Sequence, residues 1–194
     1  MASSPAIFVD RDDTIMVDVK YCADPAMVRL IPSASEGLRA LREAGYRVVI
    51  VTNQSGIGRG YFDVETLRRV HNKLRDELRR EGADYDAVYY CPHTPEEDCQ
   101  CRKPKPGLLL KAASELNIDL ASSYTVGDRD LDVGAGKAAG TRTILVSGAN
   151  HPDNSGSNPL ADFVAPNLAD AARLILSHSR IRDGREGPRI RPRS

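Results

Sequence analysis

The sequence predicts an α/β protein built on a doubly wound parallel sheet. Short apolar runs alternate with longer amphipathic stretches in the order β-α-β-α-β-α-β-α-β, which is typical of a parallel sheet with helices on both faces. The run at 47–52 has four consecutive apolar residues at its centre, as expected for a strand that is covered on both sides. A chain of 194 residues is long enough for one compact domain of this kind.

Each element has its own sequence signal. Apolar residues recur at helical spacing after Pro32 and Ser33, and Gly45 ends that helix. Asp63 is the expected N-cap of a long charged helix, on which His71 is assigned to the polar face. The predicted strands are 6–9, 47–52, 85–90, 124–127, 142–146 and a short strand near 163–164, and the later predicted helices are 63–81, 107–116, 130–139 and 168–178.

Two segments stand apart from this pattern. Residues 91–106 contain four prolines and three cysteines without periodicity, and a loop of this length in a compact domain is usually functional. Residues 180–194 contain six arginines and no apolar pattern, which is typical of disorder. We therefore predict one domain over 1–179, with the loop 91–106 inside it, followed by a basic, disordered tail over 180–194.

Composition excludes several classes of protein. Lys plus Arg and Asp plus Glu each number 27, and this balance argues against a general nucleic-acid binder. The alternative of a nucleic-acid-binding protein that uses the arginine-rich tail has little support, because aromatic residues are only 5% and no recognition module is visible. No apolar run approaches the ~18 residues of a membrane span, and the N-terminus lacks a signal-peptide pattern. We expect a cytoplasmic monomer.

Polar clusters follow the strands of the predicted sheet. Asp10 and Asp12 come directly after the first strand, Thr52 and Asn53 end the second, and Asp128 follows the fourth. Because ligands bind outside the carboxyl ends of parallel strands, these side chains are expected to converge on one site.

The residue types at these strand ends suit phosphoryl transfer. A carboxylate such as Asp10 can attack phosphorus, and a second carboxylate such as Asp12 can act as general acid and base. Two carboxylates would repel a phosphate, so a cation is required, and Asp128 could complete an oxygen-rich Mg²⁺ site. Each feature alone is ordinary turn chemistry, whereas the combination favours function. The groups that could hold a phosphoryl oxygen are the Thr52 hydroxyl, the Asn53 amide and the Lys103 ammonium.

The loop 91–106 carries a candidate metal site. Cys91, His93, Cys99 and Cys101 offer three thiolates and one imidazole within eleven residues, a set that suits tetrahedral Zn²⁺. With four protein ligands the zinc would be structural. The alternative is three free cysteines in a surface loop. Disulfides are not expected in a reducing compartment, and Cys22 is expected to be a buried or half-buried thiol.

Four motifs resemble those of the haloacid dehalogenase superfamily of phosphotransferases. They are Asp-Arg-Asp-Asp-Thr at 10–14, Val-Thr-Asn at 51–53, Lys-Pro at 103–104 and Val-Gly-Asp at 126–128, and the resemblance spans roughly residues 6–176. The runs at 52–62, 89–93 and 99–104 resemble, within that superfamily, its heptose bisphosphate phosphatases. The histidinol-phosphate phosphatases share the Cys-Pro-His and Cys-Arg-Lys-Pro elements and remain the alternative.

This resemblance implies a Rossmann-like fold and a role for each matching position. Asp10 would be the nucleophile and a Mg²⁺ ligand. Asp12 would be the general acid and base and lend its backbone carbonyl to the metal, and Asp128 would be the remaining protein ligand. The expected reaction is Mg²⁺-dependent removal of the C7 phosphate from a heptose 1,7-bisphosphate through an aspartyl-phosphate. Thr52, Asn53 and Lys103 would hold the transferring phosphate, and Arg102, Arg59 and Arg129 would reach the sugar or its second phosphate.

Two further points concern the site's surroundings. The superfamily normally has Gly after the acid/base aspartate, whereas this chain has Asp13, which tolerates a positive φ better than most residues at some cost. Activity is expected to survive. No large cap domain is present between Thr14 and Thr52, so the site is expected to be open, with the zinc loop aiming Arg102 and Lys103 at it.

Overall fold

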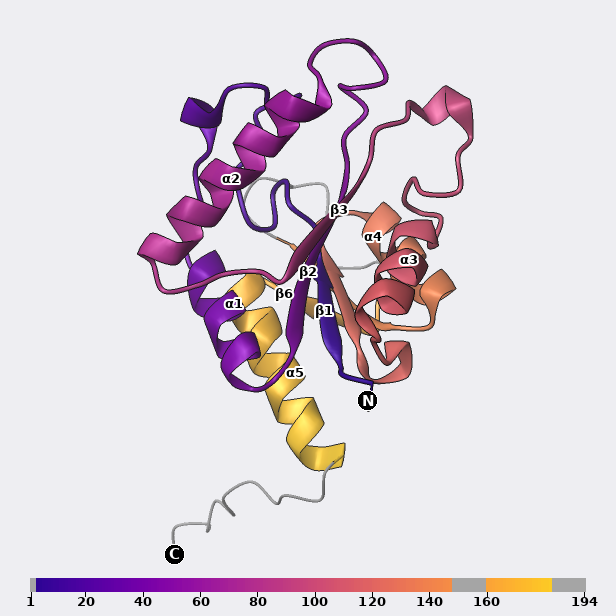
Figure 1. Ribbon diagram of the computed structural model, residues 1–194. Helices are drawn as coiled ribbons and strands as arrows, with labels where there is room; N and C mark the ends of the chain where they lie inside the picture. Colours follow the sequence, from indigo (N-terminus) through magenta and orange to yellow (C-terminus); the bar gives the residue numbers. More distant parts are fainter. Residues whose placement is uncertain (1–2, 148–159, 183–194) are drawn as a thin grey trace, which may run out of the picture.

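A computed structural model describes residues 3–147 and 160–182 of the chain. Six parallel strands form one sheet in the order β3-β2-β1-β4-β5-β6 (Figure 1). The chain places β2 and β3 on one side of β1 and then returns to place β4 on the other side, so the predicted doubly wound sheet is confirmed. The strands are β1 (Ala6–Val9), β2 (Arg47–Asn53), β3 (Ala87–Cys91), β4 (Tyr124–Gly127), β5 (Arg142–Val146) and β6 (Phe163–Ala165).

Within residues 3–147 and 160–182, five α-helices cover the two faces of this sheet. Helices α1, α2 and α5 lie on one face, and α3 and α4 lie on the other (Figure 1). The helices are α1 (Ala34–Glu43), α2 (Val64–Arg80), α3 (Gly107–Leu116), α4 (Asp130–Ala139) and α5 (Leu168–Arg182), and the short 3-10 helices are η1 (Pro25–Met27), η2 (Pro95–Glu97) and η3 (Leu120–Ser122).

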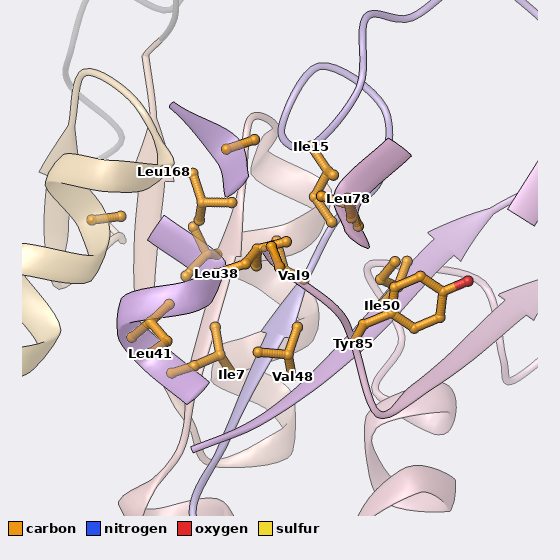
Figure 2. Close-up of a cluster of buried hydrophobic side chains, with 14 of the residues drawn as sticks. Ile7, Val9, Ile15, Leu38, Leu41, Val48, Ile50, Leu78, Tyr85 and Leu168 are labelled. Atoms are coloured by element: carbon orange, nitrogen blue, oxygen red, sulfur yellow. The ribbon is translucent and has the colours of Figure 1, made fainter. Parts of the chain in front are cut away.

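The hydrophobic core is divided by the sheet because successive strand residues point to opposite faces. Ile7 and Val9 of β1 face the cluster that contains Leu38 and Leu41 of α1 (Figure 2). Phe8, between them in sequence, packs instead with α3 and α4. All four residues of β1 are buried, so the strand that ends at the predicted nucleophile is rigidly held.

Helix ends mostly follow their sequence signals. The side chain of Asp63 accepts a hydrogen bond from the Thr66 amide at 2.7 Å, so it caps α2 as predicted. Ser33 precedes α1 in a left-handed conformation, φ 71°, and makes no side-chain capping bond. Gly45, which follows the C-cap residue Ala44 of that helix, has φ 91°, a conformation that glycine adopts without steric cost.

Several boundaries differ from the prediction. Strand β2 ends at Asn53 rather than at 52, α2 spans Val64–Arg80 rather than 63–81, and β3 ends at Cys91 rather than at 90. Strand β3 begins at Ala87 rather than at 85, because Tyr85 is buried against α2, where its hydroxyl donates to the His71 carbonyl at 3.0 Å. The irregular loop 91–106 contains the short helix η2, closed by a capping box between Thr94 and Glu97. Helix α5 continues to Arg182, so its end takes in the first three residues assigned to the tail.

The rest of that predicted tail, 183–194, lies outside the described residues. So does nearly all of the Gly-, Asn-, Ser- and Pro-rich segment at 147–160. In the part of the chain that is described, no helix combines the length and apolar character needed to cross a membrane.

Candidate active site

A cleft of about 440 Å³ lies at the carboxyl ends of β1 and β2, next to the end of β4. In a doubly wound sheet this is where the strand order reverses, and ligands bind there. Among the predicted site residues, those that line the cleft are Asp10, Asp12, Asn53, Arg102, Lys103 and Arg129. Thr52 and Asp128 are buried directly beside these residues, each 1% exposed.

Arg59 is the predicted substrate residue that does not line the cleft. Its Nη2 atom lies 3.9 Å from Oε1 of Glu96, in the loop that follows β3. The structure therefore brings the other predicted residues together and leaves Arg59 at the neighbouring surface.

Lys103 is the electrostatic centre of the cleft. Its Nζ donates to Oδ1 of Asp10 at 2.7 Å, to Oδ1 of Asp132 at 2.5 Å and to the Val51 carbonyl at 2.8 Å. Burial alone would lower the pKa of Lys103, but the two carboxylates outweigh it and raise the pKa above its ordinary value. Lys103 is therefore a fixed positive charge at the end of β1.

The surroundings of Asp10 disfavour its ionised form. Burial raises its pKa well above the ordinary value of 3.8, Lys103 opposes that shift, and the nearby carboxylates Asp132, Asp12 and Asp128 reinforce it. Crowded carboxylates in a buried site stay ionised only where positive charge offsets their repulsion. The site thus favours a bound cation.

Asp132, which was not predicted from the sequence as a metal ligand, is one of the carboxylates suited to hold that cation. Oxygen atoms of Asp10, Asp128 and Asp132 lie within 4.8 Å of one another, and a set of carboxylate oxygens fits a hard divalent cation. Asp132 reaches the cluster because Gly127 has no side chain: a Cβ atom there would lie 2.3 Å from Asp132 Cγ. The spacing of four residues between Asp128 and Asp132 at the start of α4 was the available signal.

Asp12 is held away from this cluster by donors of its own. Arg11 Nε and Nη2 donate to Oδ1 at 3.1 Å and 2.9 Å, and Nη2 also reaches Oδ2 at 3.0 Å. Gln54 Nε2 donates to Oδ2 at 3.0 Å, and the Thr52 hydroxyl lies 3.4 Å from the same oxygen. The carboxyl group of Asp12 is therefore fixed in position from two sides.

Asn53 is bound to the lysine loop. Its Nδ2 donates to the Lys103 carbonyl at 3.2 Å, and its Oδ1 accepts from the Lys103 amide at 3.1 Å. The Asn53 amide that was predicted to contact a phosphoryl oxygen thus fixes the backbone of Lys103, which in turn places the ammonium against Asp10.

The segment after β1 forms one wall of the cleft. Asp13 has φ 52°, so the position does require the left-handed conformation. Its Oδ1 accepts from the Asp18 amide at 3.0 Å, which offsets part of the cost. Asp18 in turn lies 3.4 Å from Arg129 Nη2, and Lys20 and Tyr21 line the cleft beyond it.

Two buried residues near Asp12 were not found from the sequence. Arg11 is 1% exposed, and its Nη1 lies 3.2 Å from Nε2 of His71. His71 is buried on α2, so the expectation that it lies on the polar face of that helix is wrong. Burial lowers the pKa of His71 to about 3, with a further contribution from Arg11.

The four predicted zinc ligands lie together in the loop after β3. Sulfur atoms of Cys91, Cys99 and Cys101 are 3.2–3.5 Å apart, and His93 Nδ1 lies 3.2 Å from Cys101 Sγ and 3.7 Å from Cys91 Sγ. Zinc–sulfur bonds of about 2.3 Å at tetrahedral angles place ligand atoms roughly 3.8 Å apart, and a disulfide needs about 2.05 Å. The cluster is compatible with a zinc site, and Cys22, which is buried, lies outside it.

The zinc ligands are coupled to the cleft through the chain itself. Cys101 immediately precedes Arg102 and Lys103, and Arg102 Nη1 donates to the His93 carbonyl at 3.3 Å. A metal held by these four side chains would fix the start of the segment that carries both cations.

Comparison with known proteins agrees with this geometry. Residues 100–171 match a family model described as HAD-hydrolase-like. The D-glycero-beta-D-manno-heptose-1,7-bisphosphate 7-phosphatase of Pasteurella multocida is 40% identical over 176 residues, covering 88% of this chain and 96% of that protein. The protein of the same name from Yersinia pestis is 41% identical over 180 residues, covering 89% and 96%.

Solved structures are similar as well. The D,D-heptose 1,7-bisphosphate phosphatase from B. bronchiseptica, complexed with magnesium and phosphate, has a TM-score of 0.79 and 32% identity, covering 89% of this chain and 99% of that one. The corresponding phosphatase from Burkholderia thailandensis has a TM-score of 0.68 and 31% identity over the same shares. The chain therefore belongs to the haloacid dehalogenase-like phosphatases, in the family of the D-glycero-D-manno-heptose-1,7-bisphosphate 7-phosphatases.

Proposed function

We propose that the protein is a Mg²⁺-dependent phosphatase that removes the C7 phosphate of D-glycero-D-manno-heptose 1,7-bisphosphate through an aspartyl-phosphate on Asp10. The observation that carries this proposal is the position of Asp10 at the end of β1, in contact with Lys103 and among other carboxylates. The names of the similar proteins support the substrate.

In the first step a carboxylate oxygen of Asp10 attacks phosphorus, and the bond from phosphorus to the sugar oxygen breaks. Asp12, in its protonated form, gives its proton to that oxygen, so that the sugar leaves as an alcohol. Lys103 stays beside the reacting group as a point charge for the phosphoryl oxygens. Asp10, Asp128 and the Asp12 backbone carbonyl would hold Mg²⁺, which would supply positive charge to offset the negative charge of the carboxylates and the phosphoryl oxygens. Asp132, which binds Lys103, would lie beside this ion.

In the second step water attacks the aspartyl-phosphate. Asp12, now ionised, takes a proton from that water, the acyl–phosphate bond breaks, and inorganic phosphate leaves with Asp10 restored as a carboxylate. The same side chain thus serves both steps in opposite protonation states.

Recognition of the remainder of the substrate is assigned to Arg102 and Arg129, which line the same cleft. Arg102 bonds to a backbone carbonyl and forms no salt bridge within 4.0 Å among the described residues, so its charge is available to a second phosphate. Arg129 would have to exchange its contacts with Asp18 and Asp128 for contacts with the substrate.

A phosphate-release screen tests this function. The wild-type chain is assayed with Mg²⁺ on heptose 1,7-bisphosphate, other sugar bisphosphates and histidinol phosphate, which represents the alternative function. We expect the highest kcat/KM on the heptose bisphosphate and no turnover by Asp10→Asn. Preference for histidinol phosphate would contradict the substrate, and turnover by a folded Asp10→Asn variant would contradict the mechanism.

A further inference from the structure

Arg11 and His71 form a buried pair behind Asp12 that the proposed reaction does not itself use. Both residues are almost fully buried, at 1% and 5% exposure. Burying a charged group is costly unless it is paired, and replacing buried ion pairs by apolar residues often does not reduce stability. The presence of a guanidinium and an imidazole at this position therefore points to a role other than stability.

The geometry leaves the guanidinium of Arg11 with two partners. Its Nε and Nη2 atoms donate to the Asp12 carboxyl, and its Nη1 atom points at His71 Nε2, 3.2 Å away. A guanidinium has no acceptor atom, so His71 must accept through an unprotonated Nε2. Burial lowers the pKa of His71 to about 3, which agrees with a neutral ring.

His71 lies on α2 and does not line the cleft, so it does not contact the substrate. We infer that Arg11 and His71 are positioning residues: His71 fixes the far end of the Arg11 guanidinium, and Arg11 fixes the Asp12 carboxyl group for proton transfer to the leaving oxygen. This inference rests on the proposed function. In the step concerned, the Asp12 proton moves to the sugar oxygen as the phosphorus–oxygen bond breaks and the Asp10–phosphorus bond forms.

The leaving group distinguishes this role from a merely structural one. A sugar alkoxide is strongly basic and needs a proton in order to leave, whereas p-nitrophenolate is a weak base and leaves without one. The constant kcat/KM reports steps up to release of the leaving group, so the later hydrolysis of the aspartyl-phosphate does not enter it. A misplaced Asp12 should therefore lower kcat/KM for sugar phosphates selectively.

The test compares His71→Leu, which removes the acceptor, with His71→Gln, whose amide oxygen can accept from Arg11. We expect His71→Leu to lower kcat/KM about tenfold or more on the sugar phosphate and less than about threefold on p-nitrophenyl phosphate, and His71→Gln to restore most of the loss. The matched control is His178→Leu, which removes a histidine bonded to Tyr124 outside the cleft and should leave the ratio of the two substrates unchanged.

Equal losses on both substrates, unchanged values on both, or a His71→Gln variant as selective as His71→Leu would overturn the inference. If His71→Leu does not fold, Arg11→Lys carries the same test, because lysine keeps the charge but cannot make the bidentate contact with Asp12. A wild-type chain that hydrolyses no phosphomonoester would instead reject the proposed function, so the two failures are distinguishable.

Discussion

The ammonium of Lys103 is shared between Asp10 and Asp132, with the shorter contact, 2.5 Å, to Asp132. Asp132 also accepts from the Arg129 amide at 3.1 Å, so its carboxyl group is fixed at the first turn of α4. Lys103 is thereby tied both to the end of β1, through Asp10, and to α4, through Asp132. Its charge is held beside Asp10 without depending on the substrate.

Replacing Asp132 with Asn should uncouple this arrangement. The variant keeps the shape of the side chain but removes the charge that holds Lys103, so we expect kcat/KM to fall about a hundredfold. Removing one partner of a buried ion pair should also cost about 3 kcal/mol of unfolding free energy. Steady-state kinetics and urea unfolding measure the two effects.

Asp130→Asn is the matched control for that variant, because Asp130 lies at the start of the same helix but is exposed. It should retain wild-type kinetics. Equal effects of the two substitutions would contradict the assigned role of Asp132.

Mg²⁺ binding should depend on pH through Asp10. The pKa of Asp10 is raised by burial and by neighbouring carboxylates. As a result, over the pH window between the ordinary pKa of 3.8 and this raised pKa, the metal-free folded protein binds more protons than the unfolded chain. The contribution of Asp10 to stability therefore falls as pH rises through that window. Mg²⁺ must displace the proton, so its affinity should rise in the same direction.

Thermal unfolding with and without Mg²⁺ tests this linkage. The increase in Tm caused by Mg²⁺ should be larger at about pH 8 than at about pH 5. In Asp10→Asn, which has no titrating group at that position, the pH dependence of the increase should be reduced. A Mg²⁺-induced increase that is the same at both pH values would contradict the linkage.

The sequence was most informative where local signals and tertiary packing agree. The helices Gly107–Leu116 and Asp130–Ala139 and the strand Tyr124–Gly127 have their predicted bounds. The two helices end at Asn117 and Gly140, which adopt the left-handed conformation typical of helix C-termini. The motifs at the strand ends converge because parallel strands bring their carboxyl ends to one edge. Tyr85 misled the prediction of β3, since an aromatic residue suits a strand as well as a packing site against a helix.

The buried charges could not be found in the same way. Asp132 pairs with Lys103, which is distant in sequence. Arg11 pairs with the adjacent Asp12, but it is buried because it also contacts His71 of α2. A single charged residue is usually exposed. The burial of His71, by contrast, could have been predicted from the sequence. His71 follows Leu67 by four residues and precedes Leu74 by three, so helical periodicity already placed it on the inner face of α2, and only its polarity argued otherwise.

The cysteine cluster should hold one zinc ion that supports the cleft. Cys99→Ser removes one ligand, so we expect loss of bound zinc, a lower Tm and a fall in kcat/KM of about tenfold or more, because the segment carrying Arg102 and Lys103 loses its anchor. Metal analysis of the purified protein measures the first effect. Cys22→Ser, at a buried cysteine outside the cluster, should keep its zinc, and zinc-free wild-type protein with full activity would contradict this role.

Asp13 offers a test of how the chain tolerates a carboxylate where its superfamily normally has glycine. Asp13→Gly relieves a left-handed conformation, φ 52°, but removes the hydrogen bond to the Asp18 amide. Each effect is worth about 1 kcal/mol, so the unfolding free energy should change by less than about 1 kcal/mol, and activity should survive. Asp13→Ala loses the hydrogen bond and keeps the strain, so it should be less stable than Asp13→Gly by about 1 kcal/mol. Urea unfolding measures the unfolding free energies of the wild type and the two variants. An alanine variant as stable as the glycine variant would show that the backbone at this position carries no strain.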